Sequence, residues 1–150
     1  GIDEIEFWVR TNPGTRPGPM MQVASGGELS RFLLALKVAL ADKGSAPTLI
    51  FDEIDSGAGG AVAEAIGARL ARLAAGVQVL TVTHAPQVAA RADSHLLIEK
   101  DHDDAADVTT TRVTPLGDEA RREEIARMLA GAVITAEARA AASRLLEGAA

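Results

Sequence analysis

The chain has 150 residues, 47% of them hydrophobic, which suffices for one domain with a buried core and excludes disorder over most of the length. No apolar run approaches the roughly 20 residues of a membrane-spanning helix, we expect no secretory signal, and the absence of cysteine excludes disulfides and thiolate metal sites. Fifteen Lys and Arg against 21 Asp and Glu give a net charge of −6, which argues against strong nucleic-acid binding by this chain alone.

The N-terminal part is predicted to hold a strand, a loop and a helix. Residues 5–11 are predicted to form the strand, which ends at Asn12-Pro13-Gly14 because proline and glycine break regular structure. Further prolines and glycines predict a loop over residues 13–24. One apolar stripe at helical spacing predicts the helix that follows; it comprises Leu29, Phe32, Leu33, Leu36 and Leu40.

Two short apolar runs in the middle of the chain are predicted to be strands buried on both faces. Residues 48–51 show no alternation of polar and apolar side chains, and residues 77–83 are rich in β-branched residues. A helix is predicted between them over residues 61–75, and a short helix at most over residues 86–92. This alternation predicts an α/β fold with a largely parallel sheet flanked by helices.

The C-terminal part is predicted to form two strands followed by two helices. The strands cover residues 95–99 and 108–114, on either side of a polar loop at residues 101–104. The helices cover about 118–129 and 136–146, with Gly131 as the stop between them. We find no internal repeat and no long linker, so a single domain over residues 1–150 is expected.

Ser25, Gly26, Gly27 and Glu28 open the first long helix, and two interpretations of them remain open. Serine followed by glutamate three positions later is the pattern of a capping box, a structural feature only. Alternatively, two residues without side-chain bulk let a phosphate approach the free N–H groups at the positive end of the helix dipole.

Asp52 and Glu53 are two adjacent carboxylates that end the first apolar strand. Such charges are costly in a buried place unless solvent or a cation meets them. One interpretation is a solvated acidic turn. The other is a Mg²⁺ site that carries nucleotide phosphates, with one carboxylate on the metal shell and the next aimed at a water.

His84 ends the second apolar strand, so we expect it at the same sheet edge as the two carboxylates. A purely structural histidine is the alternative. His95 and His102 have no comparable context and are interpreted as surface or strand-end residues. No pair of histidines has zinc-ligand spacing with a carboxylate, so a zinc site is not expected.

The order of these motifs resembles the C-terminal half of an ABC-type ATPase head. In that resemblance, residues 25–28 correspond to the signature motif, Asp52 and Glu53 to the Walker B pair, Asp55 to the D-loop and His84 to the switch histidine. Glu28 and Ile54 stand where transporter ATPases commonly have Gln and Pro, which favours the SMC-like branch.

Longer stretches resemble bacterial DNA repair ATPases of that branch over nearly the whole chain. They are I-E-F-W-V-R-T-N-P-G, V-A-S-G-G-E-L-S-R, L-I-F-D-E-I-D-S-G, V-T-H-A-P-Q-V-A and I-A-R-M-L-A-G. The chain departs from the expected pattern at residues 56–60, which are richer in glycine, and this leaves the D-loop contacts open.

The resemblance implies ATP and Mg²⁺ as cofactors. Asp52 would hold Mg²⁺ through its water shell, Glu53 would polarise the attacking water, and His84 would contact the γ-phosphate. Asp55 and residues 25–28 would contact nucleotide, the latter on the opposite head.

The resemblance also implies partners that complete the head. No G-x-x-x-x-G-K-[ST] motif occurs in these 150 residues, so the phosphate-wrapping Walker A loop would come from an N-terminal half of the same protein, beyond a long coiled coil. This chain would be one lobe, inactive alone. A second head would join through ATP, DNA would bind the full-length protein, and the implied location is cytoplasmic and nucleoid-associated, without a membrane partner.

Two other functions stay open at this point. One is the nucleotide-binding subunit of an ABC transporter, which Glu28 and Ile54 disfavour. The other is a non-catalytic interaction domain of the same fold, against which the intact set of Asp52, Glu53 and His84 argues.

Overall fold

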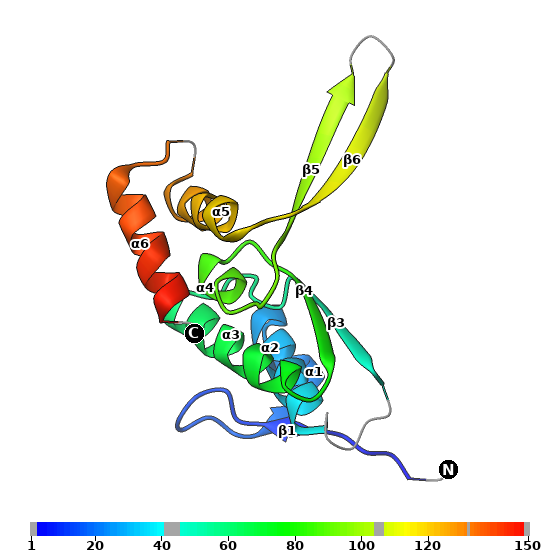
Figure 1. Cartoon of the computed structure of the whole chain (residues 1–150). Coiled ribbons are helices and arrows are strands. Elements are labelled where there is room, and N and C mark those ends of the chain that lie inside the picture. Colours follow the sequence, from blue (N-terminus) through cyan, green and yellow to red (C-terminus); the bar gives the residue numbers. More distant parts are fainter. Residues whose placement is uncertain (1–2, 41–45, 104–106, 132, 149–150) are drawn as a thin grey trace.

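The computed structural model describes residues 3–40, 46–103, 107–131 and 133–148. Within these ranges the chain has an α/β fold (Figure 1), as predicted. Its elements in order are β1 (Trp8–Val9), β2 (Gly18–Pro19), α1 (Met20–Val23), α2 (Gly26–Leu40), β3 (Thr48–Asp52), α3 (Gly60–Ala74), β4 (Gln78–Val82), α4 (Pro86–Ala89), β5 (Leu96–Asp103), β6 (Val108–Pro115), α5 (Asp118–Ala130) and α6 (Ala136–Glu147).

The centre of the fold is the parallel pair β3–β4, with α3 as the crossover between the strands. The register runs from Thr48 opposite Gln78 to Asp52 opposite Val82. The parallel pairing predicted for these two strands is therefore confirmed. Both carboxyl ends lie at one edge, which is where ligands bind in open α/β sheets.

The other strands pair antiparallel, so the parallel part of the structure is limited to β3–β4 in the described ranges. β1 pairs with β2, and β5 pairs with β6 over eight residues each. Short connections produce this pairing, because parallel neighbours need a crossover of a dozen or more residues. The β5–β6 hairpin, longer than predicted, projects from the body of the molecule (Figure 1); the end of its predicted loop, residue 104, lies outside the described residues.

The prediction that β3 and β4 are buried on both faces is wrong for the described structure. Phe51 is 2% exposed, whereas Ile50, Leu80 and Val82 are 64%, 45% and 49% exposed. Successive residues of a strand point to opposite faces, so one face packs on the core and the other is uncovered by the described residues. The apolar runs indicated burial correctly on only one face.

The core beneath β3–β4 joins the strands to α2, α3 and α4. Its buried members are Leu34, Phe51, Ala63, Ile66, Leu70, Leu73 and Val88. Helix α2 forms as predicted, but among its described side chains the buried one is Leu34, which is not a member of the predicted stripe. Leu33 is exposed, and the side chain of Leu40 lies outside the description.

A second cluster packs α4 against α5 and α6, and comprises Ala89, Ala90, Ile125, Ala126 and Ala142. Gly131 ends α5 as predicted, with φ 75° and its N–H donating to the Arg127 carbonyl at 2.8 Å. Thr135 caps α6, since its hydroxyl accepts from the Ala138 N–H at 3.2 Å.

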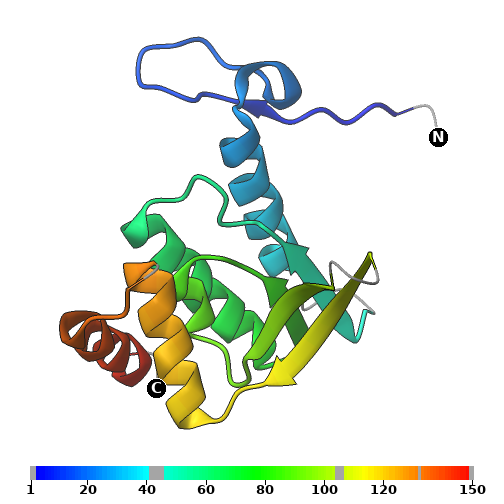
Figure 2. The ribbon, with the colours of Figure 1, turned by 90° about the horizontal axis from the view of Figure 1, so that it is seen from above.

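The N-terminal part stands apart from this body and joins it through α2 (Figure 2). The strand predicted at residues 5–11 is only Trp8–Val9, and the predicted loop contains β2 and α1. The predicted turn is confirmed by Gly14 at φ 84° and by the Thr15 N–H bond to the Asn12 carbonyl, 3.2 Å. No helix in the described ranges is long and apolar enough to cross a membrane.

Candidate functional site

The carboxyl ends of β3 and β4 bring three of the predicted site residues together. Asp52 is in register with Val82, and the Glu53 N–H donates to the Val82 carbonyl at 3.1 Å, which extends the ladder by one residue. His84 follows two residues after Val82. The expectation that both carboxylates and His84 share one sheet edge is confirmed, and all three residues are exposed.

Glu53 has left-handed backbone geometry, with φ 47°. A non-glycine residue in this region costs roughly 1–2 kcal/mol, and such residues persist where surrounding bonds hold them. Here the Glu53 N–H is held by Val82, and the Glu53 carbonyl accepts from the Ser56 N–H at 3.0 Å. The strain lies at the residue predicted to polarise the attacking water, and no sequence pattern indicates it.

The carboxylates of Asp52 and Glu53 make no hydrogen bond or ion pair with any residue that the structure describes. An exposed, uncommitted oxygen donor fits hydrated Mg²⁺, which keeps several waters and binds through one or two carboxylates plus phosphates. No group of three or more His, Cys, Asp or Glu side chains that could hold a metal occurs among the described residues. A metal at this edge would need water and phosphate oxygens to complete its ligand set, and its predicted contact with Asp52 stays a prediction.

Asp55 is buried beside this edge, at 2% exposure. Its Oδ2 accepts from the Thr83 hydroxyl at 2.5 Å and from the Ala85 N–H at 3.2 Å. The Ala85 N–H also reaches Thr83 Oγ1 at 3.0 Å. Oδ1 of Asp55 has no hydrogen-bond partner in the described part of the chain.

The burial of Asp55 bears on its predicted contact with nucleotide, which stays a prediction. In this structure its carboxyl group faces the end of β4, not the solvent. Sequence reasoning missed Thr83 as its partner. The available signal was a hydroxyl immediately before His84, at the end of an apolar strand.

The start of α2 has the full geometry of a capping box. The Ser25 N–H and hydroxyl both donate to Glu28 Oε2, at 2.8 and 2.7 Å, and the Glu28 N–H reaches Ser25 Oγ at 3.4 Å. A side chain built at Gly26 would meet nothing within 4 Å, so space is open beside the first turn. The cap is therefore real, and both interpretations of residues 25–28 include it.

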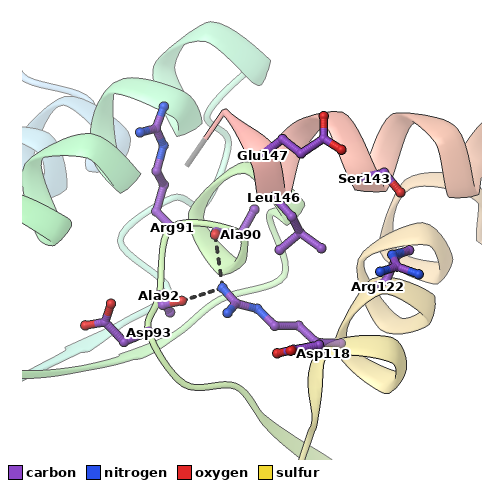
Figure 3. Close-up of a pocket in the computed structure, with 10 residues that line it drawn as sticks. Ala90, Arg91, Ala92, Asp93, Asp118, Arg122, Ser143, Leu146 and Glu147 are labelled. Carbon is purple, nitrogen blue, oxygen red and sulfur yellow. Dashed lines mark hydrogen bonds between the residues drawn. The ribbon is translucent and has the colours of Figure 1, made fainter. Parts of the chain in front are cut away.

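A separate depression of about 520 Å³ lies between the segment after α4 and helices α5 and α6 (Figure 3). Its lining mixes charges of both signs, from Arg91, Asp93, Asp118, Arg121, Arg122 and Glu147. Arg121 Nη2 donates to the carbonyls of Ala90, at 3.0 Å, and Ala92, so this arginine ties α5 to that segment. None of the predicted site residues lines the depression.

The two remaining histidines differ from each other. His102 is exposed on the hairpin, as predicted, with Nδ1 2.9 Å from Thr109 Oγ1. His95 is only partly exposed. Burial lowers the pKa of its imidazole, the Arg121 guanidinium lowers that pKa further, and Glu124 raises it.

Comparison with known proteins gives a consistent result. No protein-family model matches the chain. It is 50% identical over 147 residues to the DNA repair protein RecN of Streptomyces coelicolor, covering 98% of this chain and 25% of that protein. It is 47% identical over 146 residues to RecN of Rickettsia bellii, covering 97% of this chain and 26% of that protein.

A solved structure from work on the ATP-driven dimerisation and DNA-stimulated activation of SMC ATPases shares the fold. The TM-score is 0.57 and the identity 22%, over 77% of this chain and 68% of that one. Over nearly its whole length the chain is therefore similar to a segment of RecN proteins and shares the fold of this SMC ATPase structure, and it spans about a quarter of the length of the RecN proteins that it matches.

Proposed function

We propose that this chain is the signature-motif and Walker B lobe of an ATP-hydrolysing head in a RecN-like protein of DNA double-strand-break repair and recombination. The observation that carries the proposal is the hydrogen bond from the Glu53 N–H to the Val82 carbonyl, in register with Asp52. This hydrogen bond extends the β3–β4 ladder to Glu53, so that Asp52, Glu53 and His84 lie at one exposed strand edge. The matched relatives are DNA repair proteins, which favours this function over that of a transporter subunit.

In the proposed site, each exposed side chain has one task. Asp52 holds Mg²⁺ through coordinated water, and the ion supplies positive charge beside the phosphate oxygens. Glu53 accepts a hydrogen bond from the attacking water and orients it. His84 donates a hydrogen bond to the γ-phosphate. The left-handed backbone at Glu53 fixes the direction in which its side chain leaves the strand edge.

Residues 25–28 act on the nucleotide of a second head. The capping box fixes the Ser25 hydroxyl and the first N–H groups of α2, and the open space at Gly26 lets a phosphate approach. ATP then lies between two heads and joins them, and hydrolysis releases them.

The rest of the whole protein supplies what these 150 residues lack. The phosphate-wrapping loop and its lysine come from another segment, which also completes the head next to β3–β4, and a coiled coil separates that segment from this one. DNA contacts lie outside this acidic chain. The proposed location is the bacterial nucleoid.

The test is Glu53→Gln in the whole protein. Glutamine keeps the size of the side chain and removes the charge that orients water, so we expect kcat for ATP hydrolysis to fall by about 10²-fold or more. Nucleotide affinity should persist because Asp52 still serves the metal, and ATP-joined dimers should accumulate. Phosphate release, nucleotide titration and light scattering measure the three quantities.

Glu99→Gln is the matched control, since Glu99 is an exposed glutamate on β5, away from the strand edge. It should hydrolyse ATP as the unchanged protein does. A loss of nucleotide affinity as large as the loss of rate in Glu53→Gln would assign Glu53 to the metal and contradict its role toward water.

A further inference from the structure

Asp55 is the one buried charged residue in the described part of the chain, and it lies next to the proposed site without being exposed to it. A buried carboxylate is costly unless hydrogen bonds compensate it. Its Oδ2 has two donors and its Oδ1 has none in the described ranges. A buried polar group that is only half satisfied calls for an explanation.

The two donors bracket His84. Thr83 and Ala85 are its immediate neighbours in the chain, and both bond to the same oxygen of Asp55. The Ala85 N–H also reaches the Thr83 hydroxyl, which closes a small ring of three hydrogen bonds around the His84 backbone. The backbone on each side of His84 is thereby fixed, while the imidazole itself stays exposed.

The same carboxylate belongs to the turn that carries Glu53. Within that turn the Ser56 N–H donates to the Glu53 carbonyl at 3.0 Å, and the Ala58 N–H donates to the Asp55 carbonyl at 2.9 Å. Ile54 and Ala85, which flank Asp55 and His84 in sequence, both pack on the core cluster under β3–β4. The two loops are therefore joined by polar and apolar contacts at one point.

We propose that Asp55 is a positioning residue that acts through the Thr83 hydroxyl to hold the His84 loop in fixed relation to Glu53. This inference rests on the proposed ATPase function and gives Asp55 and Thr83 a role that requires no contact with nucleotide or metal. Displacement of a reacting group by about 1 Å can cost up to 10²-fold in rate, so a tie of this kind affects turnover more than binding.

The sharpest test changes Thr83 in the whole protein. Thr83→Val keeps the shape and removes the donor to Asp55, so kcat for ATP should fall about tenfold while KM stays within about twofold. Thr83→Ser keeps the hydroxyl and should restore most of the turnover. Asp55→Ala, which removes the acceptor, should lower kcat at least as much.

A double-mutant cycle of Thr83→Val with His84→Ala distinguishes action through His84 from a purely structural role of the Asp55–Thr83 hydrogen bond. If the hydrogen bonds act through His84, Thr83→Val should change the residual kcat by less than about twofold once the imidazole is gone. Leu73→Ala is the control for general destabilisation, because Leu73 is buried near the C-terminal end of α3, whereas the Glu53 turn leads into the N-terminal end of that helix. It should lower the melting temperature and leave kcat of the folded fraction unchanged.

The outcomes separate the two proposals. Absence of ATP turnover by the unchanged protein, or turnover that Glu53→Gln does not affect, would overturn the ATPase function and this inference together. Turnover that depends on Glu53 but is unaffected by Thr83→Val would overturn the positioning role alone, as would an effect fully additive with His84→Ala. If Asp55→Ala fails to fold, the comparison of Thr83→Val with Thr83→Ser decides whether Asp55 has the positioning role.

Discussion

The side chain of Ser25 has a single hydroxyl group, which takes part in the helix cap in the structure and, in the proposed function, contacts a phosphate on a second head. In the structure its hydroxyl and its N–H both donate to Glu28 Oε2. Substitution by aspartate would therefore place two carboxylates together within the cap, even if no phosphate ever binds. The two roles separate only when that repulsion is removed.

The double variant Ser25→Asp/Glu28→Gln separates the capping role from the phosphate contact. Aspartate caps a helix well, and glutamine also completes a capping box. Compared with Glu28→Gln alone, the double variant should keep its melting temperature but lose ATP-dependent dimerisation. A carboxylate about 4 Å from a phosphate charge is repelled by about 4 kcal/mol at an effective dielectric constant of 20. Light scattering with and without ATP, beside thermal melting, measures both effects.

Equal dimerisation by the double variant and by Glu28→Gln would leave Ser25 as a cap only. The Ser25→Thr variant provides a further comparison, since threonine keeps the hydroxyl and adds no charge. Its dimerisation should resemble that of the unchanged protein much more closely than the aspartate variant does.

For single residues, the place in the fold could be predicted from the sequence, whereas the backbone geometry, burial and hydrogen-bond partners could not. The strand-end placement of Asp52 and His84 followed from apolar runs, because parallel strands end at one edge. The left-handed backbone of Glu53 and the burial of Asp55 go with hydrogen bonds to Val82, at the end of β4, and to Thr83 and Ala85 in the loop that follows it. Contacts over some 30 positions leave no local pattern in a single sequence.

At the scale of elements, the position of α4 against α3 sets where the His84 loop ends. The two helices approach closely at Gly67, where an added Cβ would lie 3.0 Å from the Gln87 carbonyl oxygen and 3.2 Å from Val88 Cα. Backbone atoms cannot move aside as the end of a flexible side chain can. Gly67 thus permits the packing that places Ala85 and Pro86 next to the site.

Gly67→Ala should lower the free energy of unfolding, although alanine is the better helix former. The gain in helix propensity is about 1 kcal/mol, whereas overpacking costs about 1–3 kcal/mol. Gly60→Ala, also in α3, is the matched control, because its Cβ would meet only Gln87 Nε2, at 3.6 Å. Urea unfolding of both variants in the whole protein measures the difference; equal or greater stability of Gly67→Ala would contradict the close packing.

Whether a segment forms a helix or a strand could be predicted, because the signals for it are local in the sequence. Which face of an element is buried could not. An apolar stripe at helical spacing predicted α2, and Gly131 was predicted as the stop between α5 and α6. The apolar run of β3 carried no information on what covers each face, so Ile50 was expected inside and is exposed. The outer end of β5 is polar and was predicted as a loop, which is why this strand was predicted too short, whereas the start of β6 at residue 108 was predicted correctly.

At the scale of the whole molecule, the chain contains one part of a composite site. It covers about a quarter of the length of its RecN relatives, and no G-x-x-x-x-G-K-[ST] motif occurs in it. One face of β3–β4 exposes the apolar side chains of Ile50, Leu80 and Val82. In the described ranges these two strands also form a sheet of only two strands, so each has an unpaired edge. Such surfaces pair with other segments or aggregate.

The isolated 150-residue chain should therefore bind ATP weakly and hydrolyse none above its own Glu53→Gln variant. Asp52, Glu53 and His84 are present, but backbone N–H groups and a lysine that wrap the phosphates are not, and phosphoryl transfer depends almost entirely on such positioning. Phosphate release, calorimetric titration with ATP and Mg²⁺, and circular dichroism to verify helix content measure this. Turnover by the folded chain that Glu53→Gln abolishes would show that one lobe forms a complete site, and would remove the need for a second segment.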